Sequence, residues 1–405
     1  MKSLRTLYLC YFGLREPLVQ TQVLPYLRVL AARGIGVHLL TFEPDMKRAW
    51  STGAEQAERE RLAAEGINWS SLPYHKRPSL PATLYDIAAG ARAVVRLVRE
   101  HDIDVIHARA HIPLAMALIA KRFTKCALIF DIRGLMAEEY ADAGVWAAGS
   151  LKFRVIKKLE RTGIRNADQL VVLTEAMKSW LLKNQLRDAD HIEVIPCCVD
   201  FAGYGEVESQ VGDAHAFEIV YAGSVTGLYL LEEMGRFFLE VRAREPRAFL
   251  RVLTMSSAPE ASARLQRAGL ETKDFWVGKV SAHEVSQYLQ RARIGLSFRK
   301  PTFSQIAASP TKVAEYLAAG LPVVSNAGIG DMDDLLKTES VGVVVRDFTA
   351  TEFARAAEAA LALAEDERMR ARCIAVARRH FDLDMVGGNR YENVYRRIAT
   401  ARQMG

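Results

Sequence analysis

The sequence predicts an α/β protein made of two Rossmann-like, doubly wound domains that face an interdomain cleft. Short apolar segments alternate with longer helical segments along the whole chain, a pattern typical of parallel sheets. The 405 residues suffice for two to three domains, each with its own core. A polar, glycine-bearing stretch, Gly203–Ala216, interrupts the alternation, which then starts again. We therefore expect a linker there, with one domain on either side.

The expected strands are short runs rich in apolar residues. In the first half they are Thr6–Tyr11, Gly36–Phe42, Asn68–Leu72, Val105–Ala108, Ala127–Asp131, Leu170–Leu173 and Glu193–Ile195. In the second half they are Glu218–Ala222, Ala248–Leu253, Phe275–Val277, Ile294–Ser297, Pro322–Ser325 and Gly342–Val345. Expected helices include Leu84–Arg99, Leu151–Arg165 and, last in the chain, Met385–Ala401. The predicted domains are residues 1–202 and 203–382, followed by a C-terminal helical segment, 383–405.

The composition is that of an ordinary globular protein, 50% hydrophobic and 25% charged. Leu4–Phe12 is too short and too early for a signal peptide, and Pro113–Ala120 is far shorter than a membrane span. The five cysteines are odd in number and form no C-x-x-C pair, which favours reduced thiols. We expect a cytoplasmic protein, with or without peripheral attachment to the inner face of the cytoplasmic membrane.

The net charge of +6 comes from the first half of the chain. Residues 1–200 hold 28 Lys and Arg against 22 Asp and Glu, whereas the remainder holds 26 of each. Lys152–Arg165 contains six basic residues and one acidic residue on an amphipathic helical pattern. Such a helix suits an anionic membrane surface, although a solvated helix packed on its own domain has the same pattern. No nucleic-acid-binding motif accompanies the charge, so no nucleic-acid partner is expected.

The most informative segment is SPTKVAEYLAAGLPVV, residues Ser309–Val324. Ser309 is a favourable N-cap and the following proline suits the first helical position, so a helix is expected to begin there. Lys312 and Glu315 share one face of this helix, with Lys312 near solvent. A helix N-terminus attracts phosphate, and a basic and an acidic side chain beside it suit a ligand with phosphate and hydroxyl groups, such as a nucleotide-sugar. A surface ion pair on an amphipathic helix is the structural alternative.

This segment resembles the donor-binding signature of family 4 glycosyltransferases, which are retaining enzymes of the GT-B fold. Many bacterial members read SP-x-K-x-x-E-Y-x-A-x-G-x-P-V-V, and the chain matches every fixed position. Further segments follow the family's order and spacing: Tyr11–Glu43, Phe130–Trp146, Ala167–Leu181, Ile192–Asp200 and Ile219–Gly227. The resemblance covers nearly the whole chain. It implies a GT-B fold whose last helix crosses back onto the first domain.

The resemblance also implies roles in donor binding. Glu315 matches the glutamate that accepts hydrogen bonds from the ribose, and Lys312, beside Ser309, would neutralise the diphosphate. Lys279 and Val280 correspond to the segment that holds the base. Gly223 and Ser224 begin the glycine turn after a strand.

Two departures from the family pattern concern the phosphates and the sugar. Ala307 stands where many members have a second glutamate, and the turn Gly223–Gly227 lacks the usual arginine and lysine. Arg299 and Lys300 are the candidates to supply the missing positive charge, with solvated loop charges as the alternative. Positive side chains and helix N–H groups would then replace a cation, so we expect no metal ion and no cofactor besides the nucleoside diphosphate-sugar donor.

In the first domain, Gly13 follows the first strand and would let the backbone approach the donor phosphate. A dinucleotide site would need G-x-G-x-x-G, which is missing. Asp131 and Arg133 end a strand, and Arg133 stands where the family often has a histidine, which puts a histidine base in doubt. Asp131 is a candidate to hold an acceptor hydroxyl, with an ion pair to Arg133 as the alternative.

His107 and His111 have the i,i+4 spacing of a zinc pair but lack an intervening glutamate and a third ligand, so metal binding is not expected. His111 is instead a candidate acceptor contact. By resemblance the chain moves a sugar to a hydroxyl of a glycan or lipid-linked acceptor in cell-surface polysaccharide or lipopolysaccharide synthesis. Two other functions stay open: a nucleotide-sugar epimerase of similar fold and a non-catalytic sugar-nucleotide-binding subunit.

Overall fold

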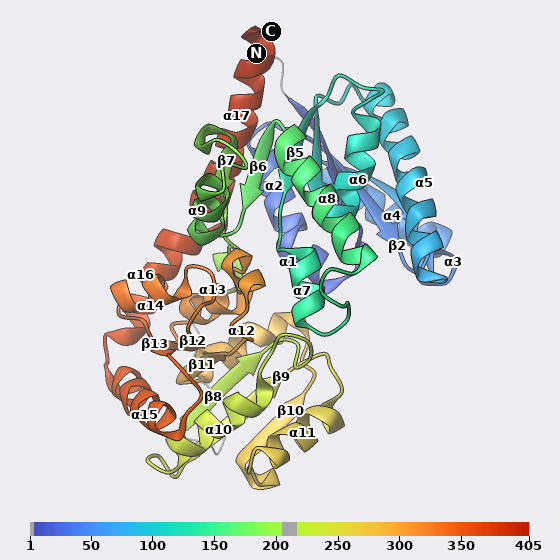
Figure 1. Ribbon diagram of the computed structural model, residues 1–405. Coiled ribbons are helices and arrows are strands. Elements are labelled where there is room, and N and C mark those ends of the chain that lie inside the picture. The colour runs from blue at the N-terminus through green and yellow to red at the C-terminus, as the bar shows by residue number, and fades with distance from the viewer. Residues whose placement is uncertain (1–3, 205–216, 405) are drawn as a thin grey trace. The chain divides into compact units, whose positions relative to one another are not determined.

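The computed structural model describes residues 4–204 and 217–404, which divide into two compact units. Unit 1 comprises Met1–Ala137, Trp146–Pro196 and Leu383–Gly405, and unit 2 comprises Glu138–Val145 and Cys197–Asp382. Each unit is a parallel sheet flanked by helices (Figure 1). Most of the predicted linker, residues 205–216, lies outside the described residues.

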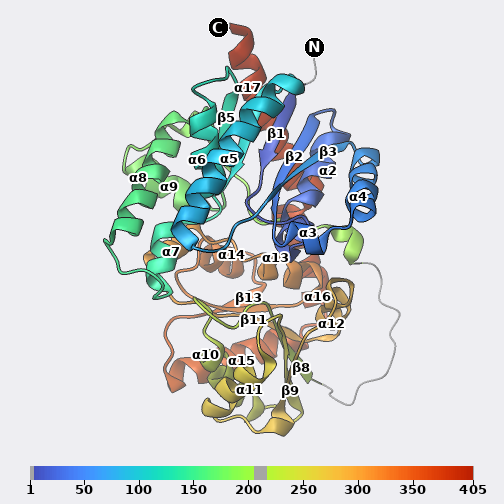
Figure 2. The same cartoon turned by 90° about the vertical axis from the view of Figure 1, so that its right-hand side faces the viewer.

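Unit 1 is built on a parallel sheet of seven strands in the order β3-β2-β1-β4-β5-β6-β7. The strands are β1 (Arg5–Leu9), β2 (Gly36–Glu43), β3 (Ile67–Pro73), β4 (Val105–Arg109), β5 (Ala127–Asp131), β6 (Gln169–Val172) and β7 (Ile192–Val194). The helices are α1 (Pro17–Gln22), α2 (Leu24–Ala32), α3 (Met46–Ala49), α4 (Thr52–Ala64), α5 (Ser79–Glu100), α6 (His111–Ala120), α7 (Met136–Asp142, which continues into unit 2), α8 (Leu151–Asn166), α9 (Glu175–Lys183) and α17 (Asn389–Met404). Figure 2 shows α5 in front of this sheet and α17 behind it.

Unit 2 is built on a parallel sheet of six strands in the order β10-β9-β8-β11-β12-β13. The strands are β8 (Phe217–Ala222), β9 (Ala248–Leu253), β10 (Phe275–Gly278), β11 (Ile294–Ser297), β12 (Val323–Asn326) and β13 (Gly342–Val345). The helices are α10 (Leu231–Arg242), α11 (Ala258–Arg267), α12 (Ala282–Arg291), α13 (Thr311–Ala318), α14 (Met332–Thr338), α15 (Ala350–Glu365) and α16 (Met369–Phe381).

The predicted α/β class and the two Rossmann-like sheets are confirmed. Each expected strand is present, with its ends shifted by at most two residues. Helix α5 begins at Ser79 rather than Leu84, because its proline, Pro81, falls in the first turn, where proline is tolerated. The start of the expected Met385–Ala401 helix is instead a π-helical turn, Leu383–Gly388, which ends in two glycines that weaken a regular helix.

Two apolar clusters cover the two faces of the sheet in unit 2. One contains Phe237, Phe298 and Phe353, of which the last two rings are stacked with centroids 6.2 Å apart. The other contains Val313, Tyr316 and Leu317 of α13 together with residues of α14 and α16. The apolar side chains of α13 therefore hold the helix against the sheet, and Lys312 and Glu315 are not part of this apolar cluster.

The end of the chain returns to unit 1 and packs there closely. A Cβ atom built on Gly388 would lie 2.5 Å from Val29 Cγ1 of α2 and 2.9 Å from Arg33 Nη2. Arg33 also donates to Glu392 of α17 at 2.9 Å, and Arg390 Nη1 donates to the Val194 carbonyl of β7 at 2.7 Å. Gly388 thus provides the space in which the chain enters α17.

We predict that Gly388→Ala destabilises the protein by about 1–3 kcal/mol, because the methyl group overpacks against Val29. Gly53→Ala in α4 is the matched control, since a Cβ atom there meets nothing within 4 Å. Thermal unfolding of both variants checks this. A Gly388→Ala melting temperature equal to that of Gly53→Ala would show that the contact between α2 and the end of the chain is loose.

Candidate active site

Helix α13 begins one residue later than predicted. Pro310, with φ −67° and ψ 111°, is the N-cap, and the first helical residue is Thr311. The expected N-cap hydroxyl, Ser309 Oγ, instead accepts the backbone N–H of Cys197 at 3.1 Å. Ser309 is buried by this contact and so helps to fix the chain where it enters α13. The predicted end of the helix is correct, since Gly320 follows it with φ +83°.

Lys312 is buried, which corrects the expectation that it lies near solvent. Its side chain leaves the first turn of α13, and its Nζ donates to the hydroxyl of Tyr221 on β8 at 3.0 Å. The same Nζ lies 4.1 Å from the ring centroids of both Tyr221 and Tyr229. The two ring faces favour an ammonium ion. Burial outweighs them and, with the nearby Arg299 charge, holds the pKa of Lys312 well below its usual range.

Gly223 makes room for this lysine. It follows β8 directly with φ +137°, a conformation that side-chain-bearing residues rarely adopt. A Cβ atom there would lie 3.0 Å from Lys312 Nζ and 3.2 Å from its Cε. The next residue, Ser224, accepts the hydroxyl proton of Tyr221 at its carbonyl. The structure therefore brings Gly223, Ser224 and Lys312 together, as the sequence predicted.

Arg299 lies in the same cluster and is not a solvated loop charge. Its Nε donates to Gln305 Oε1 at 2.6 Å and its Nη1 donates to the Tyr229 hydroxyl at 3.3 Å. The guanidinium also lies over the Tyr229 ring, 4.9 Å from its centroid. Lys300 points elsewhere, since its Nζ donates to the Asp142 carbonyl at 3.2 Å. Arg299 is thus the second positive charge beside Lys312.

Glu315 lies one turn further along α13. Its carboxyl forms no hydrogen bond or ion pair with the described residues, so the predicted alternative of an ion pair with Lys312 is not formed. Burial raises the pKa of Glu315 to about 7, and the Lys312 charge opposes this only in part. The group can therefore accept hydrogen bonds as a carboxylate or donate one as a carboxylic acid near neutral pH.

The segment predicted to hold the base follows β10. Lys279 is exposed, whereas Val280 packs against the apolar cluster of α13. Ala307 is buried and cannot replace the missing glutamate. Sequence reasoning missed Tyr221, Tyr229 and the buried Gln305. Of these three residues, only Gln305 could have been suspected from the sequence, because it is a polar residue two positions before Ala307, where many family members have a glutamate.

In unit 1, Asp131 ends β5 completely buried. Its Oδ2 accepts the hydroxyl of Tyr391 on α17 at 3.0 Å, and Arg133 Nη1 lies 3.5 Å from Oδ1. Burial alone would raise the pKa of Asp131, but Arg133, His107 and Arg109 outweigh it and hold the pKa well below its usual range. This geometry favours the structural alternative for Asp131 and Arg133, in which they anchor α17 to the sheet.

His111 is also buried, with Nε2 2.9 Å from Glu160 Oε2 on α8 and its ring edge-on to Phe130. His107 turns elsewhere, with Nδ1 2.9 Å from the Tyr395 hydroxyl of α17. The two histidines therefore form no zinc pair. Gly13 lies under Pro44, where a Cβ atom would be only 2.7 Å from Cδ, so packing by itself requires a glycine there.

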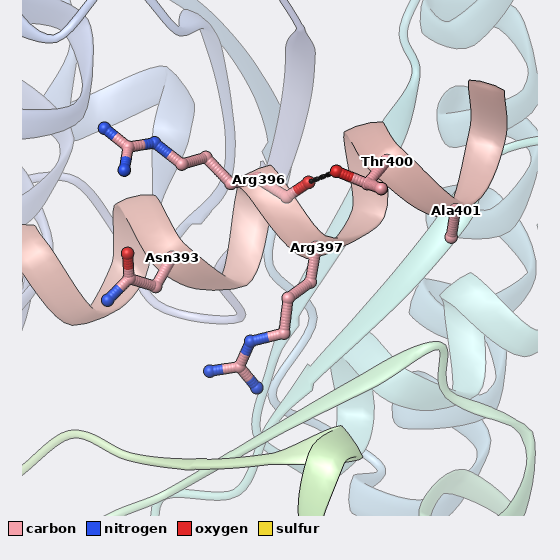
Figure 3. Close-up of a pocket in the computed structure, with 5 residues that line it drawn as sticks. All are labelled: Asn393, Arg396, Arg397, Thr400 and Ala401. Carbon is pink, nitrogen blue, oxygen red and sulfur yellow. Dashed lines mark hydrogen bonds between the residues drawn. The ribbon is translucent and has the colours of Figure 1, made fainter. Parts of the chain in front are cut away.

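A hollow of about 510 Å³ lies on α17, and none of the residues that line it is a predicted site residue. Figure 3 shows its side chains, with the Thr400 hydroxyl donating to the Arg396 carbonyl. The guanidinium of Arg396 is paired with Glu392, and that of Arg397 with Glu193. These charges are already neutralised within unit 1, so the hollow is not a candidate active site.

Comparison with known families identifies the family of the chain. Residues 19–198 match the family of glycosyl transferase 4-like domains, and residues 216–363 match the glycosyl transferases group 1 family. The chain is a GT-B glycosyltransferase. The second match contains Gly223, Lys312 and Glu315. Membership of these families makes the enzyme a nucleotide-sugar-dependent glycosyltransferase.

Solved structures show the same fold across the whole chain. Sucrose-phosphate synthase from Thermosynechococcus elongatus is 15% identical, with a TM-score of 0.74 over 98% of this chain and 100% of its own. A glycosyltransferase from Rickettsia africae is 13% identical, with a TM-score of 0.71 over 98% and 99%. HepE from Anabaena, in complex with UDP and glucose, is 15% identical, with a TM-score of 0.65 over 97% and 99%. No curated protein matches this glycosyltransferase in sequence.

The raised pKa of Glu315 makes a prediction about stability. The folded pKa, about 7, lies above the ordinary value of 4.5, so the folded state binds more protons between these values. The contribution of Glu315 to stability is therefore fully present below about pH 4.5 and is lost as pH rises through 7. We predict that Glu315→Gln raises the melting temperature relative to wild type at pH 8 but not at pH 4.5. An equal difference at both pH values would mean that the carboxyl is well solvated.

Proposed function

We propose that this enzyme transfers a sugar, with retention of anomeric configuration, from a nucleoside diphosphate-sugar to a hydroxyl of a glycan or lipid-linked acceptor. Cell-surface polysaccharide or lipopolysaccharide synthesis is the proposed setting. The observation that carries the proposal is the buried Lys312, held between Tyr221 and Tyr229 beside Gly223, with an unpaired Glu315 one turn away. The solved HepE structure, which contains UDP and glucose, lends support to a donor of this class.

The buried lysine would respond to a bound diphosphate. Without a ligand, burial disfavours the ammonium form of Lys312, and the phosphate charges would restore it. Arg299 adds a second positive charge, and the first turn of α13 adds the positive end of a helix dipole. These groups would stabilise the diphosphate as it leaves, which lowers the barrier to transfer. They also supply the positive charge for which many transferases use a metal, so we propose that no metal ion is needed.

Glu315 would bind the ribose. Its carboxyl has no partner among the described residues and lies on the same helix as Lys312. In the transfer step, the bond between the anomeric carbon and the diphosphate oxygen breaks while the acceptor oxygen bonds to the same face of that carbon. The proton of the acceptor hydroxyl passes to the leaving phosphate, so the step needs no protein base.

Helix α8 is the proposed contact with an anionic membrane. Leu151 and Val155, four residues apart, are 77% and 55% exposed, with the exposed cations Lys152, Arg154 and Lys158 beside them. An apolar pair ringed by cations is the pattern of a helix that lies in a membrane interface. No helix among the described residues is both long and apolar enough to cross a bilayer.

Lys157 is excluded from this contact, which corrects the expectation for the whole of Lys152–Arg165. Its Nζ donates to Glu160 Oε1 at 2.5 Å, and its side chain is only 15% exposed. Because Glu160 also holds His111, a charge reversal at Lys157 would disturb the fold as well as the surface.

Lys312→Met tests the donor site. The variant keeps the length of the side chain but loses the charge, so donor affinity should fall about ten- to a hundredfold, the range of hydrogen bonds to charged groups. Lys337→Met, at an exposed position of α14 outside every predicted site, is the matched control. Wild type is first screened with a panel of nucleoside diphosphate-sugars by thermal shift, and both variants are then titrated by calorimetry. Unchanged affinity of Lys312→Met would place the donor elsewhere.

The same donors, labelled in the sugar, test the reaction itself. Incubation with wild type should give transfer or slow hydrolysis. Formation of an epimer without release of the nucleotide would identify an epimerase, and binding without any product would identify a sugar-nucleotide-binding subunit. Either of these results would contradict the proposed function.

Flotation with vesicles tests the membrane contact. We predict that wild type floats with anionic vesicles at low salt and less at physiological salt, because screening shortens the Debye length to about 8 Å. Reversal of Lys152 and Lys158 to Glu should release it, since each cation contributes about 1 kcal/mol near an anionic surface. Reversal of Arg236 and Arg244 in unit 2 is the control for net charge. If wild type does not float with anionic vesicles at low salt, the membrane contact is wrong and α8 is a solvated helix packed on its own unit.

A further inference from the structure

A second polar cluster lies in unit 1, at the carboxyl end of its sheet, and contains none of the residues assigned above. His75 follows β3 by two residues, and Tyr11 follows β1 by two residues. Both bind Asp86 of α5, whose side chain is 1% exposed. Asp86 Oδ2 accepts the Tyr11 hydroxyl at 2.7 Å and the His75 backbone N–H at 3.0 Å. Ligands of open α/β sheets bind at this end of the strands.

The cluster fixes the orientation and the tautomer of the His75 ring. Nδ1 of His75 lies 2.5 Å from Asp86 Oδ1. An ionised carboxylate only accepts hydrogen bonds, so Nδ1 carries a proton, and in the tautomer with the proton on Nδ1 the other nitrogen, Nε2, is a hydrogen-bond acceptor. The side chain is 42% exposed, and Nε2 makes no hydrogen bond to the described residues. One buried carboxylate therefore holds both the backbone and the ring of a histidine whose other nitrogen faces outward.

Two further tyrosine rings belong to this cluster. Tyr85 is 62% exposed, and its ring lies edge-on to His75 with centroids 5.0 Å apart. Tyr74 instead contacts Tyr11, edge-on with ring centroids 5.3 Å apart. Apolar ring faces beside one oriented hydrogen-bonding group are the usual elements of a site for a small polar ligand. A sugar ring presents both complementary surfaces, C–H groups to the aromatic faces and hydroxyls to the imidazole.

Burial of a carboxylate is costly unless its hydrogen bonds are satisfied. The hydrogen bonds of Asp86 go to Tyr11 and to one partly exposed histidine, His75. This arrangement resembles the way in which outer residues orient a functional imidazole. A role in packing alone would not require Nε2 to face outward without a partner.

We propose that His75 is an acceptor-binding residue, whose Nε2 accepts a hydrogen bond from a hydroxyl of the acceptor sugar while Tyr85 packs against the sugar ring. Asp86 is a positioning residue that acts through His75. The inference rests on the proposed function, because it assigns the sugar at this site to the acceptor. Unit 1 would thus contribute a defined hydroxyl contact, in addition to the membrane contact of α8.

Nuclear magnetic resonance of ¹⁵N-histidine-labelled protein tests the proposal. The probes are the methyl α- and β-glycosides of glucose, galactose, mannose and N-acetylglucosamine, each titrated to millimolar concentration. We expect a saturable shift of the His75 Nε2 resonance with at least one of them. Saturation transfer to the glycoside protons then measures the affinity of wild type and of the variants below.

Two conservative variants separate binding from structure. His75→Asn keeps a group that reaches Asp86 but has nothing at the position of Nε2, whereas His75→Gln reaches toward the position of Nε2. The proposal predicts that Asn lowers glycoside affinity about two- to tenfold, the range of a neutral hydrogen bond, and that Gln restores part of it. A purely structural role predicts that His75→Asn has the higher melting temperature of the two variants and that both variants bind the glycosides equally well. Equal affinity of the two variants would overturn the proposal.

The remaining outcomes are also decisive. No His75 shift with any glycoside, or a shift produced by anionic vesicles alone, would overturn the proposal, the latter in favour of a lipid contact. Binding of the nucleotide-sugar panel is measured on the same samples. Normal donor binding without a His75 shift defeats only this inference, whereas absence of donor binding defeats the proposed function and leaves the His75 result to be judged separately.

Discussion

The burial of Lys312 is the constraint on which the proposed donor site depends. An amine taken out of water needs either a compensating charge or aromatic faces, and here Tyr221 and Tyr229 provide the faces. The same requirement accounts for Gly223, because any side chain there would enter the space of the ammonium group. The proposed donor site therefore already has its side chains in place, and burial disfavours the ammonium form of Lys312. A diphosphate would supply the missing partner.

Unit 1 is organised around a different buried charge. Asp131 is satisfied by Arg133 and by the hydroxyl of Tyr391, which arrives from the end of the chain on α17. Because Asp131 is completely buried and already has these partners, it is a poor candidate for an acceptor contact. Asp86 is also buried, but it orients an outward-facing histidine. The difference between these two aspartates is what directs attention to His75 rather than to Asp131.

The sequence predicts local features well and distant partners poorly. The strand positions follow almost to the residue from the apolar pattern, which is a local signal. Gly223, Ser224 and Lys312, which come from two separate segments of the family resemblance, lie together, and their role in donor binding stays a prediction. Ser309 was assigned as an N-cap, but its partner, Cys197, is 112 positions away. Lys312 was expected near solvent because nothing nearby in sequence reveals the two tyrosines that enclose it. The same holds for His111, whose partner Glu160 lies on another helix.

The central claim is that burial disfavours the ammonium form of Lys312 in the free enzyme and that a bound diphosphate restores it. Calorimetric titration with the best-bound nucleoside diphosphate, in buffers of different ionisation enthalpy, counts the protons taken up. At pH 8.5 Glu315 is already ionised, so its own titration adds little. The account predicts uptake of up to one proton by wild type and none by Lys312→Met. Tight binding by wild type without proton uptake would contradict it.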